Sequence, residues 1–305
     1  MISYDQTFIQ PEMRGDWYVD EKLKKVWFVQ LDLMKKLDGI CKENGLRWYP
    51  IFGTLLGTVR HKGFIPWDDD VDVLMPREDF DKLKKICDRG LDDPYFLQTT
   101  LSDEECYMYI AALRNSDTTG NRSSCLKLKQ NNGIAIDIFP LEGCENNLNM
   151  FRIRRFPMYV RSVLCNTYVN EINTSWKAKL LRRVLRCFNL DYKKAYRKLE
   201  AINSRHPFDG SETCTITLQR DGGTKHLSQQ VWKSEWFEKT VKMPFEDMIV
   251  SVPAGYDKIL TSFYGDYMKI PPMEKRNAKH DVVFEPDIPY KEYVKIMNEK
   301  GSPRR

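Results

Sequence analysis

The residues of this chain with the clearest capacity for chemistry are the carboxylates of the acidic run 68–72, Asp-Asp-Asp-Val-Asp. The run leads into an apolar, β-branched segment, residues 71–75, which ends at Pro76 and is typical of a strand. Side chains alternate between the two faces of a strand, so Asp70 and Asp72 point to one face and the apolar side chains to the other. The sequence therefore predicts one face ready for burial and one that carries two neighbouring carboxylates.

Asp70 and Asp72 are predicted to bind a divalent cation. Two neighbouring carboxylates repel each other, and burial would raise the pKa of at least one of them. Mg²⁺ removes this cost, since it prefers oxygen ligands at about 2.0–2.1 Å and commonly takes one or two carboxylates together with water and substrate phosphate. The alternative is a solvated acidic turn before an ordinary strand, but aspartate is depleted in strands, which favours a site for Mg²⁺ or Mn²⁺.

A third carboxylate is predicted on a neighbouring strand. In residues 133–140, three isoleucines share one face, while Ala135, Asp137 and Phe139 share the other. A single aspartate in an apolar strand is costly to bury unless it is paired or bound to something. Asp137 is therefore the predicted third metal ligand. A glycine turn, a strand with Asp-x-Asp and a later strand with one Asp together resemble the layout of the nucleotidyltransferase fold.

Groups that could hold phosphate lie just before the acidic run. Gly53-Thr54 follows a short apolar, aromatic run and is expected to form a turn, where a glycine lets backbone N–H groups approach phosphate oxygens. Arg60 and Lys62 add positive charge between this turn and the acidic run. Arg60 is predicted to clamp phosphate, the alternative being a solvated surface arginine.

Three further residues are candidates for the same pocket. Trp67, directly before the acidic run, is expected either to stack on a base or a choline-like cation or to pack in the core. Near the C-terminus, the stretch 266–272 ends in Pro-Pro and is expected to line a pocket edge, and Arg276 and His280 follow it, either of which could face phosphate.

The long string GTLLGTVRHKGFIPWDDDVDVLMPREDF resembles the signature of the LicD family, the phosphocholine transferases related to fukutin. The resemblance continues at IAIDIFPLEG and at PFEDMIVSVPAGYDKILTSFYGDYMKIPPMEKR. The similar pieces span roughly residues 21–143 and 235–281 and leave the middle poorly covered. The first motif is highly specific and the last moderately so.

The resemblance implies an α/β domain with a mixed sheet flanked by helices and a metal-dependent transfer reaction. Phosphocholine, or a similar phospho-alcohol, would move from a CDP-linked donor to a glycan hydroxyl, as in the decoration of cell-surface polysaccharide or teichoic acid. Asp70 and Asp72 would hold Mg²⁺ or Mn²⁺ against the donor diphosphate, and Asp137 would complete the site and act as base toward the acceptor. Gly53 and Thr54 would position phosphate.

Two other functions stay open at this point. The same three carboxylates could support a nucleotidyltransferase that adds NMP to an alcohol, to phosphocholine or to a protein side chain. A non-catalytic nucleotide- or glycan-binding protein is the other alternative, against which the intact carboxylates argue.

Composition indicates a cytoplasmic globular protein. Of the 305 residues, 42% are hydrophobic and 30% charged, no apolar run is long enough for a membrane helix, and the N-terminus lacks a signal-peptide pattern. The eight cysteines include no closely spaced pair, so free thiols are expected. A zinc site from dispersed cysteines and histidines stays open.

A composition shift predicts three segments: a catalytic core at 1–143, a basic helical insertion at 144–205 and a C-terminal segment at 206–305 that completes the pocket. Residues 151–200 hold 13 Lys and Arg against 3 Asp and Glu, a net charge of +10 in a chain of +5. This charge could form a solvated helix face or contact anionic lipid headgroups reversibly at the inner face of the cell membrane. No nucleic-acid motif is present, so no nucleic-acid partner is expected.

Local patterns predict the remaining elements. Helices are expected at 21–44, 78–89 and 256–264, and strands at 94–98, 107–114 and 248–252. Trp232, Trp236 and Phe237 are expected to begin another helix or packed segment, and a glycine loop at 219–226 to form a surface turn or reach the donor phosphate. The last twenty residues are expected to end in a frayed tail.

Overall fold

The computed structural model describes residues 2–106, 108, 110–144, 192–216, 231–276 and 281–299. Most of the predicted basic insertion, including Arg182, Arg183 and Arg186, lies outside these ranges, as do the glycine loop at 219–226 and His280. The three predicted segment boundaries therefore stay predictions.

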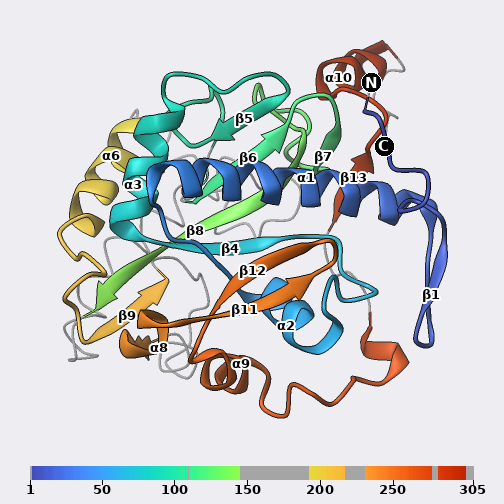
Figure 1. The fold of residues 1–305 in the computed structure, drawn as a ribbon. Helices are drawn as coiled ribbons and strands as arrows, with labels where there is room; N and C mark the ends of the chain where they lie inside the picture. The colour runs from blue at the N-terminus through green and yellow to red at the C-terminus, as the bar shows by residue number, and fades with distance from the viewer. Residues whose placement is uncertain are drawn as a thin grey trace, which may run out of the picture.

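A mixed seven-stranded sheet forms the centre of the molecule, as predicted (Figure 1). Its strands are β3 (Tyr49–Pro50), β4 (Asp72–Pro76), β5 (Tyr95–Gln98), β6 (Ala111–Asn115), β8 (Ile134–Cys144), β9 (Thr213–Ile216) and β10 (Val231–Lys233). Their order is β10-β9-β8-β4-β3, with β6 paired to β8 and β5 to β6. The neighbours β4 and β8 run parallel, whereas the other pairs in this sheet are antiparallel.

Two predicted helices pack on this sheet. The first, α1 (Glu21–Asn44), is capped by the Asp20 carboxylate, which accepts a hydrogen bond from the N–H of Leu23, and it ends at Gly45 with a φ of 63°. The apolar face of α1 packs against β6 and β8. The second, α3 (Arg77–Cys87), follows β4 directly and buries Phe80 and Leu83. Helical periodicity was sufficient to predict both elements.

The turn predicted at Gly53-Thr54 is wrong, because both residues belong to the first turn of a helix, α2 (Phe52–His61). This helix buries Leu55 and Leu56 in the core. Burial of these two leucines favours a helix over an open glycine turn. Gly53 therefore offers its backbone N–H from a helix N-terminus.

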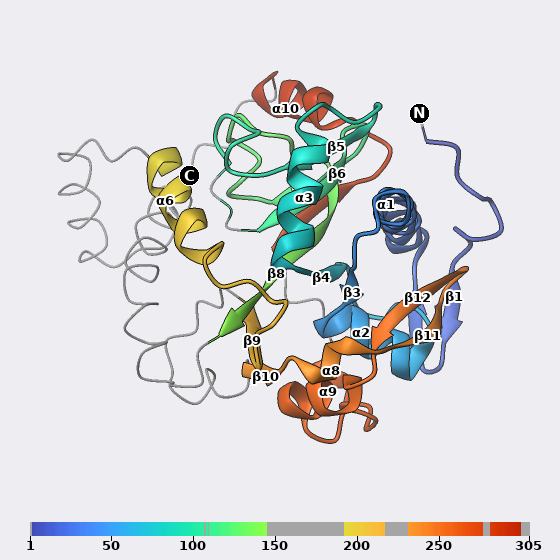
Figure 2. The same ribbon diagram turned by 60° about the vertical axis from the view of Figure 1, so that its left-hand side comes forward.

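The rest of the described chain forms three two-stranded sheets and several helices. The sheets pair β1 (Glu12–Arg14) with β2 (Trp17–Val19), β11 (Thr240–Phe245) with β12 (Met248–Pro253), and β7 (Thr119–Arg122) with β13 (Val282–Glu285). The helices are α6 (Tyr192–Asn203), α8 (Glu235–Glu238), α9 (Tyr256–Tyr264), the 3₁₀ turn η1 (Met273–Lys275) and α10 (Tyr290–Glu299). Figure 2 views α1 nearly end-on and shows α9 and the β11–β12 hairpin below the sheet.

Three predictions at the C-terminal side need comment. The helix predicted at 256–264 and the strand at 248–252 are confirmed. Trp232 lies in strand β10, whereas Trp236 and Phe237 form the four-residue helix α8. Helix α10 occupies half of the last twenty residues and follows β13, which pairs with β7, whereas the end of the expected frayed tail, residues 300–305, lies outside the described ranges.

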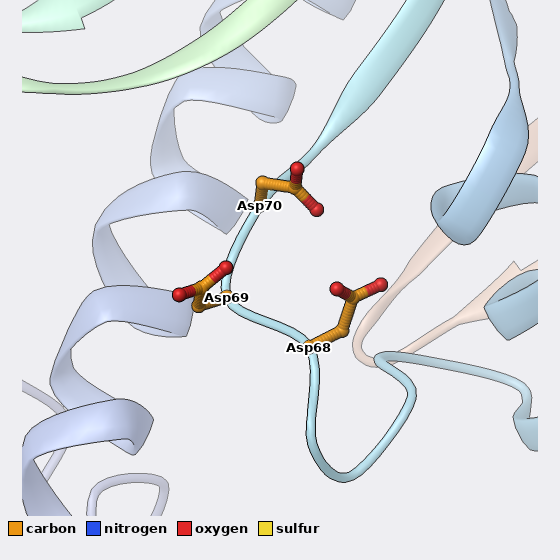
Figure 3. Close-up of side chains that lie close together, drawn as sticks. All are labelled: Asp68, Asp69 and Asp70. Carbon is orange, nitrogen blue, oxygen red and sulfur yellow. The ribbon is translucent and has the colours of Figure 1, made fainter. Parts of the chain in front are cut away.

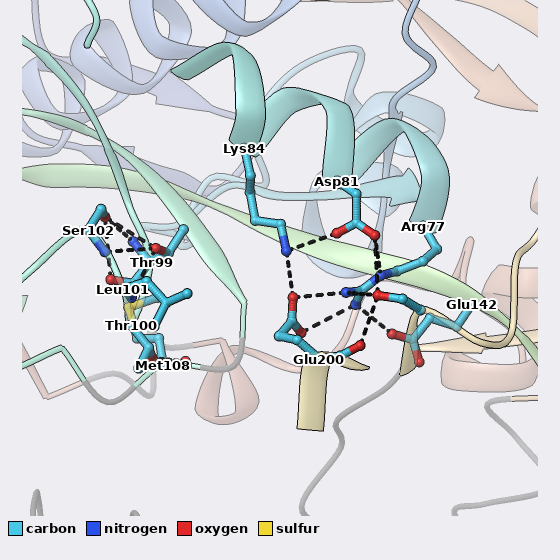
Figure 4. A network of polar contacts seen from close by, with 11 residues as sticks. Arg77, Asp81, Lys84, Thr99, Thr100, Leu101, Ser102, Met108, Glu142 and Glu200 are labelled. Atoms are coloured by element: carbon cyan, nitrogen blue, oxygen red, sulfur yellow. Dashed lines mark hydrogen bonds and ion pairs between the residues drawn. The ribbon is translucent and has the colours of Figure 1, made fainter. Parts of the chain in front are cut away.

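A buried ionic network fastens α6 to the core (Figure 4). The Arg77 side chain, 2% exposed, donates to Glu142 of β8 at 2.9 Å and to Glu200 of α6 at 2.8 Å. Its Nε also donates to Asp81, one turn along α3, and Lys84 pairs with both Asp81 and Glu200. The surrounding carboxylates compensate the charge of the buried Arg77 guanidinium. The network therefore attaches α6, where the described structure resumes, to α3 and β8.

Two general features agree with the composition. Within the described ranges, no helix is long and apolar enough to cross a membrane. The six cysteines in the same ranges are free thiols, namely Cys41, Cys87, Cys106, Cys125, Cys144 and Cys214.

Candidate active site

The parallel pairing of β4 with β8 brings two of the predicted carboxylates together. Asp72 lies opposite Asp137 in the register, and the N–H of Asp137 donates to the Val71 carbonyl at 2.8 Å. Asp70 lies two residues before the start of β4, separated from Asp72 by Val71, and so lies at the same edge of the sheet. The predicted adjacency of the Asp-x-Asp strand and the later Asp strand is therefore confirmed.

Helix α2 holds the start of β4 in place. The hydroxyl of Thr54, which is buried, accepts a hydrogen bond from the N–H of Asp72 at 2.8 Å. Strand β3 pairs with β4 on the other side of the same segment, and Ile51 at its end donates its N–H to the Asp72 carbonyl at 3.0 Å. The backbone of Asp72 is thus fixed through both its donor and its acceptor.

The loop before β4 adds a carboxylate that was not predicted as a ligand. Ligand oxygens of Asp68, Asp69 and Asp70 lie within 4.8 Å of one another. In Figure 3, Asp69 turns toward α1, whereas Asp68 and Asp70 turn to the opposite side. A Cβ added at Gly53 would lie 2.4 Å from Asp68 Oδ2, so only glycine permits this approach of the carboxylate to the N-terminus of α2.

The electrostatics of Asp72 reflect its three neighbouring carboxylates. Burial raises the pKa of Asp72 well above its ordinary value, and the negative charges of Asp70, Asp137 and Asp68 raise it further. Tyr264 is 44% exposed, yet desolvation of its phenol, and then the charges of Asp68, Asp72 and Asp70, raise the pKa of this group. Asp72 therefore lies at the centre of a negative cluster that Tyr264 of α9 faces.

A cavity of about 370 Å³ lies beside the cluster and shares Asp68 and Gly53 with it. Its aromatic wall is formed by Trp67, Tyr264 and Tyr267. Lys269 and Pro271 also line it, which confirms that the stretch 266–272 forms a pocket edge. The cavity therefore combines aromatic rings with charges of both signs.

The three predicted phosphate-facing cations occupy different places. Arg60 lines the cavity, where its Nη1 donates to the Tyr267 carbonyl at 2.7 Å, and burial and the charge of Arg276 lower the pKa of its guanidinium. Lys62 is exposed at the C-terminus of α2, outside the residues that line this cavity. Arg276 lies over the Trp67 ring at 5.2 Å and donates to Asp16 and to the Pro271 carbonyl.

Sequence reasoning missed Asp68 and Tyr264 as members of the site. Asp68 carried a local signal, because it begins the acidic run, but alternation along a strand selects only Asp70 and Asp72. Tyr264 carried none, since it ends an ordinary amphipathic helix near the other end of the chain. Only the packing of α9 beside α2 brings it to the carboxylates.

A mixed sheet that places aspartates of two parallel strands side by side, next to a glycine at a helix N-terminus, is the arrangement that the sequence resemblance implies for a nucleotidyltransferase-type domain. Residues 45–161 match the family model described as LicD/FKTN/FKRP, nucleotidyltransferase domain. Over these residues the chain is similar to the nucleotidyltransferase domain of the LicD family, which confirms the resemblance noted in the sequence.

One curated relative is similar over most of its length. The chain is 25% identical over 269 residues to lipopolysaccharide cholinephosphotransferase LicD of Haemophilus influenzae, which covers 85% of this chain and 96% of that protein. Shorter similarities reach the uncharacterized protein RP689 of Rickettsia prowazekii, 39% identical over 77 residues, and RT0683 of Rickettsia typhi, 45% identical over 47 residues. These two cover 25% and 15% of this chain, and 27% and 15% of the respective relatives.

Proposed function

We propose that this protein transfers phosphocholine from CDP-choline to a hydroxyl of a glycan with the help of Mg²⁺ or Mn²⁺. The observation that carries the proposal is the register of β4 and β8, which sets Asp72 opposite Asp137 beside Asp70. The similarity to a lipopolysaccharide cholinephosphotransferase along nearly its whole length supports the choice of phosphocholine. The family match supports the class of reaction.

The residues present fit a divalent cation. Asp70, Asp72 and Asp137 are hard oxygen donors, and the raised pKa of Asp72 reflects mutual repulsion that a cation would relieve. These three residues would hold the ion, and Asp68 lies close enough to Asp70 to join them. When bound, the ion supplies positive charge against the donor diphosphate and the leaving CMP.

The protein's own groups then position and activate the substrates. Arg60 and the backbone N–H groups at Gly53 and Thr54, at the N-terminus of α2, bind donor phosphate oxygens. Asp137 accepts the proton of the acceptor hydroxyl as its oxygen attacks the phosphorus that carries choline. A new oxygen–phosphorus bond forms, the bond from this phosphorus to the bridging oxygen of the diphosphate breaks, and CMP leaves with that oxygen.

The cavity beside the carboxylates suits a quaternary ammonium group. Aromatic faces attract such cations, and Trp67, Tyr264 and Tyr267 provide three rings in one wall. Asp68 and Asp266 add negative charge to the same cavity. We therefore assign this cavity to the choline end of the donor.

The acceptor and the location follow from the same proposal. The name of the Haemophilus relative points to a lipopolysaccharide-type glycan, and a lipid-linked glycan at the inner face of the membrane is the corresponding acceptor here. A cytoplasmic enzyme would meet it by reversible contact, for which the +10 charge of residues 151–200 is suited.

The test is incubation with CDP-choline, a glycan acceptor and Mg²⁺ or Mn²⁺, followed by mass spectrometry of both products. Phosphocholine transfer releases CMP, whereas attack on the other phosphorus releases phosphocholine and leaves CMP on the acceptor. Asp70→Asn should abolish turnover, and Asp137→Ala should impair transfer more than donor binding. Donor binding without turnover at any acceptor would instead support a binding protein and contradict the proposal.

A further inference from the structure

The loop that carries the acidic residues is held by side chains of α1. We define the acidic loop as residues 62–71, which join α2 to β4. The indole Nε1–H of Trp27 donates to the Asp68 carbonyl at 2.9 Å, and the Gln30 amide donates to the Asp69 carbonyl at 2.8 Å. Trp27 and Gln30 are three residues apart on one face of α1, so the helix meets two successive carbonyls of the loop.

Gln30 has a feature that packing alone does not explain. Its side chain is 1% exposed, and its Oε1 finds no hydrogen-bond partner in the part of the chain that the structure describes. An apolar side chain of similar size would fill this site without the cost of a desolvated oxygen. The amide is explained by its one hydrogen bond, which is the bond to Asp69.

Trp27 is itself held rigidly. Its ring stacks on Phe64 of the acidic loop with centroids 4.7 Å apart and planes at 2°, and the Arg14 guanidinium lies 4.7 Å from the indole centroid. Arg14 pairs with Glu246, and the Glu246 carboxylate accepts the N–H of Phe64 at 3.0 Å. These contacts fix the indole ring relative to the acidic loop and so hold its N–H in position to donate to the Asp68 carbonyl.

We infer that Trp27 and Gln30 are positioning residues that hold the acidic loop in its metal-binding geometry. Each hydrogen bond to a loop carbonyl fixes the plane of that peptide unit. The planes at Asp68 and Asp69 in turn set the directions of the flanking carboxylate side chains. The oxygens of Asp68, Asp69 and Asp70 repel one another within 4.8 Å, so an unsupported loop would spread. Support from neighbouring donors keeps such ligands ordered before the ion arrives.

This inference rests on the proposed metal site, and its test measures metal affinity directly. Mn²⁺ binding is measured by the electron paramagnetic resonance signal of free Mn²⁺ for the wild type, Trp27→Phe and Gln30→Met. Trp27→Phe keeps an aromatic ring for the stack on Phe64 and removes the N–H, and Gln30→Met keeps the length of the side chain and removes the amide. Each should weaken Mn²⁺ binding about tenfold or more. At saturating Mn²⁺, the kcat of each variant should return closer to the wild-type value than its apparent dissociation constant for Mn²⁺ does.

Trp232→Phe is the matched control. Trp232 is equally buried, and its Nε1–H donates to the Ser262 hydroxyl at 3.4 Å, not to the acidic loop. This variant should bind Mn²⁺ within about twofold of the wild type, which separates loop positioning from general loss of packing. If folded Trp27→Phe and Gln30→Met bind Mn²⁺ as tightly as the control, this inference is overturned, but the proposed metal chemistry is not. Absence of binding by the wild type would overturn the proposed metal chemistry and the inference together.

Discussion

Ionisation of Asp72 destabilises the metal-free fold, because burial and then the charges of Asp70, Asp137 and Asp68 raise the pKa of this carboxyl. A structural role would favour replacing one of these carboxylates with an amide, which removes charge and keeps shape. A cation-binding site, in contrast, requires such a cluster of carboxylates. Functional sites commonly lower the stability of the folded protein in this way.

Asp72→Asn should make the metal-free protein more stable while it abolishes transfer. Loss of the buried charge relieves repulsion, with a gain of about 0.5–2 kcal/mol in unfolding free energy. Urea unfolding in EDTA measures the gain, and the donor assay measures activity. A destabilised Asp72→Asn protein in EDTA would mean that Asp72 has a structural bond stronger than this repulsion.

The stabilisation by Mn²⁺ should increase with pH. Because the folded pKa of Asp72 is raised above the value of an ordinary carboxyl, the folded state binds more protons than the unfolded state between these two values. The contribution of Asp72 to metal-free stability is therefore present at low pH and is lost as pH rises through this window. Ionisation frees the carboxylate for the metal, so the shift in Tm caused by Mn²⁺ should be larger at pH 8 than at pH 5.5. Equal shifts at both pH values would contradict this linkage.

At the scale of elements, β4 and α2 form one positioning unit around Asp72. Patterns of alternation and periodicity predicted β4, β8, α1, α3 and α9, because each buries a face that its own sequence defines. The same local reasoning failed at Gly53-Thr54, where burial of Leu55 and Leu56 decides for a helix. It also could not find Tyr264 or the donors on α1, since their roles depend on packing between elements distant in sequence.

Thr54→Val should damage the site more than Thr58→Val on the same helix. Valine preserves the shape of Thr54 but removes the acceptor of the Asp72 N–H, at a cost of about 1–3 kcal/mol. Thr58 is equally buried, yet its hydroxyl only donates to the Thr54 carbonyl within α2. Thermal unfolding and Mn²⁺ titration of both variants check this. Equal Mn²⁺ affinity in the two variants would separate Thr54 from the site.

At the scale of the whole molecule, the N-terminus of α3 binds the chain that returns after residue 191. Arg77 reaches Glu200 of α6 and Glu142 of β8 (Figure 4), while Asp79 accepts from Arg47, which also pairs with Asp209. Strands β9 and β10 then extend the central sheet beside β8, and β11, β12 and α9 follow. These ion pairs at the N-terminus of α3 thus hold the chain just before the segment that contributes Tyr264 and Tyr267 to the cavity.

Arg77→Met should destabilise the protein strongly. The change leaves the buried carboxylates of Glu142 and Glu200 without their guanidinium partner, a loss of about 3–5 kcal/mol. Lys84→Met removes a more exposed partner of Glu200 and Asp81 and should cost only about 1 kcal/mol. Urea unfolding of the two variants provides the comparison, and similar losses would show that burial of Arg77 contributes little.

The central claim is that Asp70, Asp72 and Asp137 hold a divalent cation against the donor. Anomalous diffraction at the manganese edge, from crystals grown with Mn²⁺ and CDP-choline, tests it most directly. We expect an anomalous peak at about 2.0–2.3 Å from carboxylate oxygens of Asp70 and Asp72, on the face shared with Asp137, with the donor diphosphate in contact. Donor bound in the cavity with no anomalous peak at these carboxylates would contradict the account.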